Sequence, residues 1–282
     1  MKVCRPGPQC LMAWPMMSAA LMTGAAAPTN AALLFSDDFA YSNGDLAGNG
    51  GGTGWLASSL WTGGSGATGN LVANPLPGTD GKSIQIASNG SETSRPLSAT
   101  YASGNATSYY ISFVFNADPF PSAGSAQYAG VSVYLASDRS NNLFMGIPGG
   151  TGEFGFDWTN RSQAYAPGAN NTTYLALYAI APGTNTGTTS ITMYGSTNLR
   201  LTGTALMQLS PWASSDNEAH FNFDTVGFAG AYNTGTISLA GLAMADSPNE
   251  AVAFTQTAVP EPGLLAAGAA TLVIAWSIVR CR

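Results

Sequence analysis

Charged residues are scarce in this 282-residue sequence, in which Lys, Arg, Asp and Glu together make up only 9%. A typical soluble protein has about 25%, and a cytosolic surface depends on such mixed charge for solubility. Because 45% of the residues are hydrophobic, a charge-rich disordered chain is also excluded. The formal net charge of −6 provides no basic surface for nucleic acid, so we expect no nucleic-acid partner.

Cysteine and histidine are almost absent. The three cysteines, Cys4, Cys10 and Cys281, lie near the two ends of the chain, so its middle forms no disulfide and no thiolate metal site. His220 is the only histidine, which leaves little for a histidine metal site or a Ser-His-Asp triad. We interpret it as a surface or edge residue. The middle must then be stabilised by an apolar core.

The first 31 residues have the layout of an export signal. Lys2 and Arg5 precede an uncharged apolar stretch over residues 11–27, and small residues follow. We expect a signal helix that is cleaved after Ala31. An uncleaved N-terminal anchor is the alternative.

A second apolar stretch lies near the C-terminus. Residues 263–279 carry no charge, and at about 1.5 Å per residue they would span about 26 Å as a helix. That length is at the lower limit for crossing a membrane. Arg280 and Arg282 follow at once, and positive charges beside a span stay in the cytoplasm. We expect a transmembrane helix over 263–279, a cytoplasmic tail over 280–282, and the middle of the chain outside the cytoplasm.

A short motif, Val259-Pro260-Glu261-Pro262, stands directly before this helix. Its two prolines hold the carboxylate in an extended segment that a processing enzyme can reach. The motif, the apolar helix and the terminal arginines together resemble the PEP-CTERM sorting signal of bacterial envelope proteins. The resemblance covers residues 259–282. It implies an exosortase as processing partner, the inner membrane as the site of the precursor, and a link with exopolysaccharide and biofilm.

The segment 32–246 contains about ten short runs with the two-residue alternation of half-buried strands, separated by Gly, Pro, Asn, Ser and Thr. They are Leu33–Phe39, Ser83–Ala87, Tyr109–Asn116, Gly130–Ala136, Leu143–Ile147, Glu153–Trp158, Thr173–Ile180, Ser190–Tyr194, His220–Gly227 and Thr236–Met244. Strands without crossover helices predict one antiparallel, jelly-roll-like β-sandwich, an all-β fold. We expect Asn43–Asn70 to be a long loop and residues 247–258 a linker.

One strand also predicts its buried face. In Tyr109–Asn116, the set Tyr109, Ile111, Phe113 and Phe115 is larger and more aromatic than the alternate set, so we expect it to face the core.

Two further segments carry a resemblance. Asp37–Tyr41 followed by Gly54-Trp55, together with the late strand Phe223–Phe228, are similar to the laminin-G or concanavalin-like superfamily of jelly-roll domains. This resemblance implies the fold rather than an activity.

No group of residues in the sequence has the spacing or the motif of a known type of catalytic site. The best carboxylate pair, Glu153 and Asp157, is four residues apart on one predicted strand, about 13 Å. A retaining glycosidase needs about 5–5.5 Å and an inverting one about 6.5–9.5 Å. The glycine-rich segment 48–54 lacks the Lys-Ser/Thr of a phosphate loop, and no G-x-S-x-G motif is present. We expect no catalytic residue and no cofactor.

The sequence also contains oxygen ligands that calcium could use and aromatic residues that could stack on sugars. The acidic groups with oxygen ligands are Asp37-Asp38, Asp157 with Asn160, and Asp216-Asn217-Glu218, but no EF-hand or acidic repeat joins them, so we expect no metal. The tryptophans that could stack on sugars are Trp55, Trp61, Trp158 and Trp212, although core packing explains them more simply.

Three functions are compatible with these observations. The first is an exported, non-catalytic envelope or extracellular-matrix protein that acts as a structural or adhesive module. The alternative is a lectin-like module that binds carbohydrate, for example exopolysaccharide. A secreted glycoside hydrolase is the third, and the carboxylate spacing disfavours it.

Overall fold

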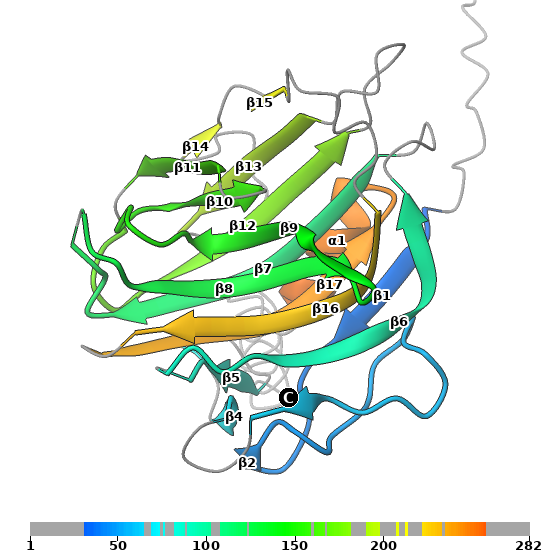
Figure 1. Cartoon of the computed structure of the whole chain (residues 1–282). Coiled ribbons are helices and arrows are strands. Elements are labelled where there is room, and N and C mark those ends of the chain that lie inside the picture. The colour runs from blue at the N-terminus through cyan, green and yellow to red at the C-terminus, as the bar shows by residue number, and fades with distance from the viewer. Residues whose placement is uncertain are drawn as a thin grey trace, which may run out of the picture. The chain divides into compact units, whose positions relative to one another are not determined.

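Two antiparallel β-sheets pack face to face (Figure 1). The computed structural model describes residues 31–64, 69–73, 76, 82–87, 89–102, 108–122, 124–158, 161–166, 168–181, 190–197, 207–208, 212–213, 222–232 and 235–257. The expected all-β antiparallel sandwich is confirmed. The expected signal helix, except its last residue, and the whole sorting signal 259–282 lie outside the described residues.

The larger sheet has ten described strands in the order β14-β13-β12-β7-β17-β5-β4-β2, with β1 pairing to β17 and β15 to β13. Their bounds are β1 Leu33–Asp37, β2 Gly44–Asp45, β4 Leu71–Ala73, β5 Ser83–Gln85, β7 Tyr109–Asp118, β12 Thr172–Ala181, β13 Ser190–Ser196, β14 Met207–Gln208, β15 Trp212–Ala213 and β17 Thr236–Ala245.

The smaller sheet has seven described strands in the order β11-β10-β9-β8-β16-β6-β3. Their bounds are β3 Thr62–Gly63, β6 Thr93–Ala102, β8 Tyr128–Leu135, β9 Asp138–Ile147, β10 Phe154–Trp158, β11 Arg161–Ala166 and β16 Asn222–Ala231. The described part of β16 begins at Asn222, and His220, the first residue of the predicted strand, lies outside the described residues.

Strand β6 was not expected from the sequence. Pro96 lies within it, and proline cannot donate to a sheet hydrogen bond. The strand accommodates Pro96 because its register with β16 shifts between Phe223 and Thr225. A bulge of this kind hides the alternation on which sequence interpretation depends.

The core lies between the two sheets. Tyr109, Ile111, Phe113 and Phe115 are all buried there, which confirms the predicted face of β7. The ring of Phe113 stacks on that of Tyr178 in β12 with centroids 5.7 Å apart. Such aromatic pairs stabilise a core beyond the area that they bury.

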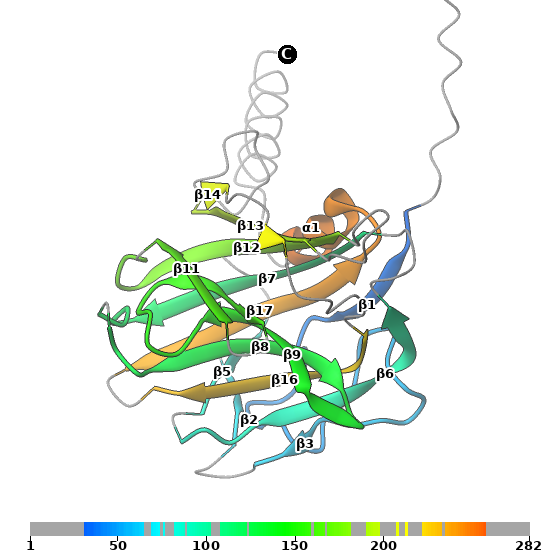
Figure 2. The same ribbon diagram turned by 45° about the horizontal axis from the view of Figure 1, so that its top comes forward.

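The linker expected over residues 247–258 is instead occupied by a helix, α1, over Pro248–Thr257. It lies on the outer face of the ten-stranded sheet, away from the core between the sheets (Figure 2). Ser247 caps it, accepting a hydrogen bond at Oγ from the amide of Glu250. Pro248 occupies the first turn, where its missing N–H costs nothing.

Buried contacts hold α1 on the sheet. Ala251 and Val252 are buried in a second apolar cluster that also contains residues of β7, β12 and β17. The hydroxyl of Ser112 in β7 donates to the carbonyl of Ala251 at 2.5 Å and lies 2.8 Å from the Thr255 hydroxyl. Because these contacts are buried, the sandwich domain extends to Thr257.

In the described part of the chain, no helix is both long enough and apolar enough to cross a membrane.

Candidate functional site

Asp37, one of the candidate calcium ligands, is fully buried and surrounded by protein donors. Its Oδ1 accepts a hydrogen bond from the amide of Phe39 at 2.9 Å. Its Oδ2 accepts hydrogen bonds from the Tyr41 hydroxyl at 2.6 Å and from the Trp61 indole at 3.0 Å. Burial raises the pKa of the Asp37 carboxyl, although these hydrogen bonds oppose the shift.

Arg95 completes this buried group. Its Nη1 lies 3.4 Å from Asp37 Oδ2 and donates to the Gly51 carbonyl at 2.8 Å, and its Nε donates to Ser59 Oγ at 3.2 Å. The guanidinium also lies 4.6 Å from the centre of the Trp55 ring. Because both oxygens of Asp37 already accept bonds from the chain, the group fastens the long loop to the core and is not a ligand site.

Two of the four candidate tryptophans belong to this core. Trp61 is fully buried and Trp55 is 8% exposed, so neither is available to stack on a sugar. Trp158 lies on β10 and Trp212 on β15, but their side chains lie outside the described part. So do Asn160 and the acidic stretch 216–218.

The glycine-rich segment 48–54 pairs closely with β1. The amides and carbonyls of Ser36 and Thr53 exchange two hydrogen bonds of 3.0 Å. A Cβ on Gly52 would lie 1.8 Å from the Ser36 carbonyl oxygen, and Gly52 has φ of +70°. The glycine therefore allows two backbones to approach, as expected where no side chain fits.

The outer face of the seven-stranded sheet is the best candidate for function. Val131 and Val133 of β8 are fully buried in the core, so the alternate residues of this strand point to the outer face. The register places small residues side by side there on four neighbouring strands. We call them the small-residue strip: Gly130, Ser132, Gly146, Gly155, Gly227 and Ala229.

An aromatic pair lies against one member of the strip, Gly130. Tyr128 of β8 and Phe144 of β9 are half-buried, and their rings meet edge to face with centroids 5.9 Å apart. A Cβ on Gly130 would lie only 3.0 Å from the tip of the Phe144 ring. The missing side chain at Gly130 thus lets this ring lie across the sheet.

A polar group lies against another member of the strip, Gly227. Glu92 accepts a hydrogen bond at Oε1 from the Tyr134 hydroxyl at 2.5 Å and forms an ion pair at Oε2 with Arg139. Arg139 also donates to the Tyr134 hydroxyl at 2.9 Å, and its guanidinium lies 4.4 Å from the centre of that ring. A Cβ on Gly227 would lie 2.3 Å from Glu92 Oε1, so glycine leaves room for the carboxylate.

The members of this polar group differ in exposure. Tyr134 is almost fully buried, whereas the side chains of Glu92 and Arg139 are 23% and 57% exposed. Burial and the hydrogen bond to Glu92 raise the pKa of Tyr134 to about 12, so it stays neutral at ordinary pH. The face therefore offers solvent a carboxylate acceptor and a guanidinium donor, both held in place by Tyr134.

The carboxylates considered in the sequence do not form a pair on this face. Asp157 lies opposite Phe144 in the register of β9 and β10, on the outer face. Glu153 precedes β10 and is not part of the strand. Among the described residues, no group of three or more His, Cys, Asp or Glu side chains is placed to hold a metal ion.

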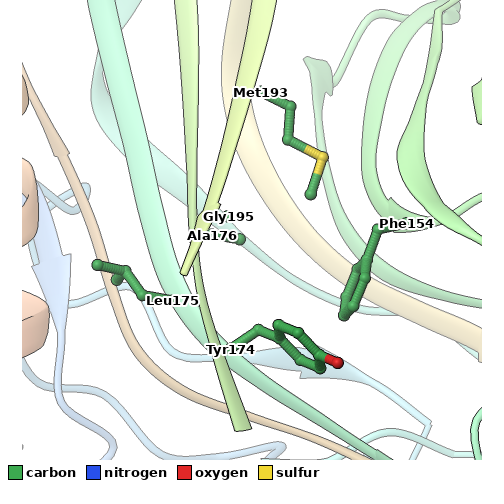
Figure 3. A pocket seen from close by; sticks show the side chains of 6 residues that line it. All are labelled: Phe154, Tyr174, Leu175, Ala176, Met193 and Gly195. Atoms are coloured by element: carbon green, nitrogen blue, oxygen red, sulfur yellow. The ribbon is translucent and has the colours of Figure 1, made fainter. Parts of the chain in front are cut away.

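A separate depression lies beside β12 and β13 (Figure 3). It has essentially no room for a water molecule, so it is not a ligand pocket of the ordinary kind. Its lining residues are Phe154, Tyr174, Leu175, Ala176, Met193 and Gly195. The one hydroxyl among them, on Tyr174, already accepts a hydrogen bond from the amide of Ala169 at 2.8 Å.

Sequence reasoning did not find the residues of the outer face. Alternation in Gly130–Ala136 does place Gly130, Ser132 and Tyr134 on one side. The partners Glu92, Arg139 and Phe144 come from other strands and turns, and a single sequence does not give the register that joins them.

No protein-family model matches the sequence, and no curated protein matches it. Among solved structures, the globular domain of T. cruzi calreticulin matches with a TM-score of 0.47 and 10% identity, covering 88% of this chain and 100% of that one. Lectin II from Ulex europaeus matches with a TM-score of 0.40 and 11% identity over 74% of this chain and 96% of that one.

The binding domain of botulinum neurotoxin serotype D gives a TM-score of 0.45 at 11% identity, over 67% of this chain and 47% of that one. At these scores and identities, the likeness concerns the β-sandwich alone. It assigns this chain neither a family nor a function.

Proposed function

We propose that the sandwich is a non-catalytic, lectin-like module that binds carbohydrate on the outer face of its seven-stranded sheet. One observation carries the proposal: the aromatic pair Tyr128–Phe144 and the group Glu92–Tyr134–Arg139 lie against members of one strip of small residues, Phe144 over Gly130 and Glu92 over Gly227. Aromatic rings stack on the C–H faces of sugars, and a few fixed polar groups set orientation and specificity.

The charge of the face favours a neutral glycan. Sugar hydroxyls both donate and accept, so Glu92 can accept from one hydroxyl while Arg139 donates to another. Residues 32–262 hold all 15 acidic residues of the chain and five of its nine basic ones. An anionic polymer would therefore meet repulsion over most of the surface.

The distances on this face support a binding role over hydrolysis. Glu92 lies over Gly227 in β16, three strands away from Asp157 in β10. At about 4.8 Å per strand, this is about 14 Å, beyond the range of either glycosidase geometry. Glu92 is also held by Arg139 and Tyr134, which suits a fixed ligand contact better than a proton carrier.

The delivery of the module is part of the proposal. The apolar N-terminal stretch and the segment 259–282 support export, an inner-membrane precursor, and processing by an exosortase at Pro260-Glu261-Pro262. The mature domain would then act at the cell surface or in the extracellular matrix. Exopolysaccharide is the natural ligand at that location.

A glycan array tests the binding role. The exported protein, labelled on its surface, is expected to bind neutral oligosaccharides and to leave sulfated and uronate-rich ones unbound. A reducing-sugar assay on the polysaccharides that contain the bound motif should show no release. An array without any bound glycan would contradict the proposal. If sugar is released and the variant Glu92→Gln no longer releases it, the protein is a hydrolase and the non-catalytic proposal is wrong.

A further inference from the structure

The first residues of the domain make a specific contact with the end of β17. The amide nitrogen of Ala32 donates to Oδ1 of Asp246 at 2.8 Å, and the amide of Asp246 donates back to the Ala32 carbonyl at 3.2 Å. Pairing of β1 with β17 starts at the next residues, Leu33 and Ala245, and its register shifts before Phe35. These two bonds therefore close the end of the ladder that holds β1 in the sheet.

This contact coincides with the cleavage site expected from the sequence. Hydrolysis of the Ala31–Ala32 peptide bond by water leaves a carboxylate on Ala31 and an ammonium group on Ala32. We infer that Asp246 is the binding site for this new amino terminus. Its ligand is an α-ammonium group of the chain itself, which forms an ion pair with the carboxylate once the leader has been removed.

The position of the nitrogen makes the contact selective for one terminus. A cut one residue later would remove the Ala32 nitrogen altogether. A cut one residue earlier would place the charge about 3.3 Å farther along the extended chain, beyond direct contact with Asp246.

Cleavage also strengthens the contact. In the precursor, a neutral amide donates to Asp246. In the mature chain the donor also carries a full positive charge, so the attraction between two opposite charges adds to the hydrogen bond. The pair helps to hold β1, whose Phe35 is buried in the core and whose Asp37 organises the group around Arg95.

The test uses the full chain, expressed with its own leader in a bacterium that exports it. Mass mapping of the exported protein should give Ala32 as the first residue. The rate at which an acylating reagent modifies the α-amine at pH 7 then reports the ion pair, since pairing keeps the amine protonated. Asp246→Asn should raise this rate about 1.5- to 5-fold, the range that corresponds to a partly exposed ion pair. Asp38→Asn, at the far end of β1, should leave it unchanged.

A second variant covers the case in which Asp246→Asn fails to fold. A glycine inserted after Ala31 moves the ammonium away while the Ala32 amide still donates to Asp246. Its α-amine should react as fast as that of the Asp246→Asn chain. A mature chain that starts at another residue, or equal rates in wild type and both variants, would overturn the inference. Neither result depends on whether the module binds glycan.

Discussion

Asp37 and Arg95 show how a single residue pair can hold a long loop. Asp37→Asn would leave Arg95 without its counter-charge, and its amide N–H would face a donor in either orientation, because both oxygens of Asp37 accept hydrogen bonds. Breaking a buried ion pair from one side costs about 3–5 kcal/mol. We expect the free energy of unfolding, measured by urea denaturation, to fall by this amount.

Asp38→Asn is the matched control for this prediction. Asp38 is exposed and accepts one hydrogen bond, from the Ala40 amide. Exposed substitutions usually change stability by less than about 0.5 kcal/mol. Equal loss of stability in the two variants would mean that the buried pair contributes nothing of its own.

The raised pKa of Tyr134 predicts that the stability of the folded protein depends on pH in the alkaline range. Its pKa is raised from 10.0 to about 12 in the folded protein, so the folded state holds this proton more tightly than the unfolded state. The associated stability is fully present below pH 10 and is lost as the pH rises through about 12. Tyr134→Phe lacks the hydroxyl and should lose less stability over the same interval.

Urea denaturation of both proteins across that pH interval gives the comparison. All other residues are the same in both chains, so the difference between the two curves isolates Tyr134. Parallel curves would show that its hydroxyl titrates like that of an exposed tyrosine.

At the scale of elements, the sequence predicted strands well where one face alone is apolar or aromatic. Tyr109–Asn116 is an example, because its aromatic set reveals the inner face. Strand β6 was missed because Pro96 and a register shift interrupt its alternation. The helix α1 was missed because a ten-residue segment is too short for its periodicity to stand out from that of a linker.

The candidate site was the least predictable part. The small-residue strip is made by the register between strands that are far apart in the sequence. Glu92 reaches the face only because Gly227 has no side chain, and the two are 135 positions apart. Such a contact depends on the completed sheet and has no local signal.

The docking of α1 leads to a prediction for this element. Val252 is buried against the sheet, whereas its neighbour Ala253 is exposed. A buried carboxylate without a partner is costly, so Val252→Asp should release the helix from β7 and β17. Hydrogen exchange over residues 248–257 should become faster in Val252→Asp and stay slow in Ala253→Asp. Fast exchange already in the wild type would contradict a docked helix.

At the scale of the whole molecule, the extent of the domain bears on the proposed processing. Because α1 ends at Thr257, only residues 258–262 separate it from the expected transmembrane helix. Five extended residues reach at most about 18 Å. The sandwich of the precursor would then lie close to the membrane surface, and processing at Pro260–Pro262 would release it with α1 intact.

Glu261→Ala tests this processing step. We expect the exported wild type to lose residues 263–282, and the variant to accumulate uncleaved in the inner membrane of the native host. Cell fractionation and intact mass measure both outcomes. Glu250→Ala, a change of the same kind in the first turn of α1, should be processed like the wild type. If the mature wild type keeps residues 263–282, the processing hypothesis is wrong and the segment is a simple membrane anchor.

The central claim is that the outer face of the seven-stranded sheet binds a glycan, and a titration with Phe144→Ala tests it most directly. The wild type and this variant are titrated with the oligosaccharide that binds best on the array. Leu56→Ala serves as the control, because Leu56 is 50% exposed on the loop between β2 and β3. We predict that Phe144→Ala weakens binding at least about tenfold, the loss of roughly 1.4 kcal/mol expected for a stacking ring. Equal affinity in all three proteins would place the site elsewhere.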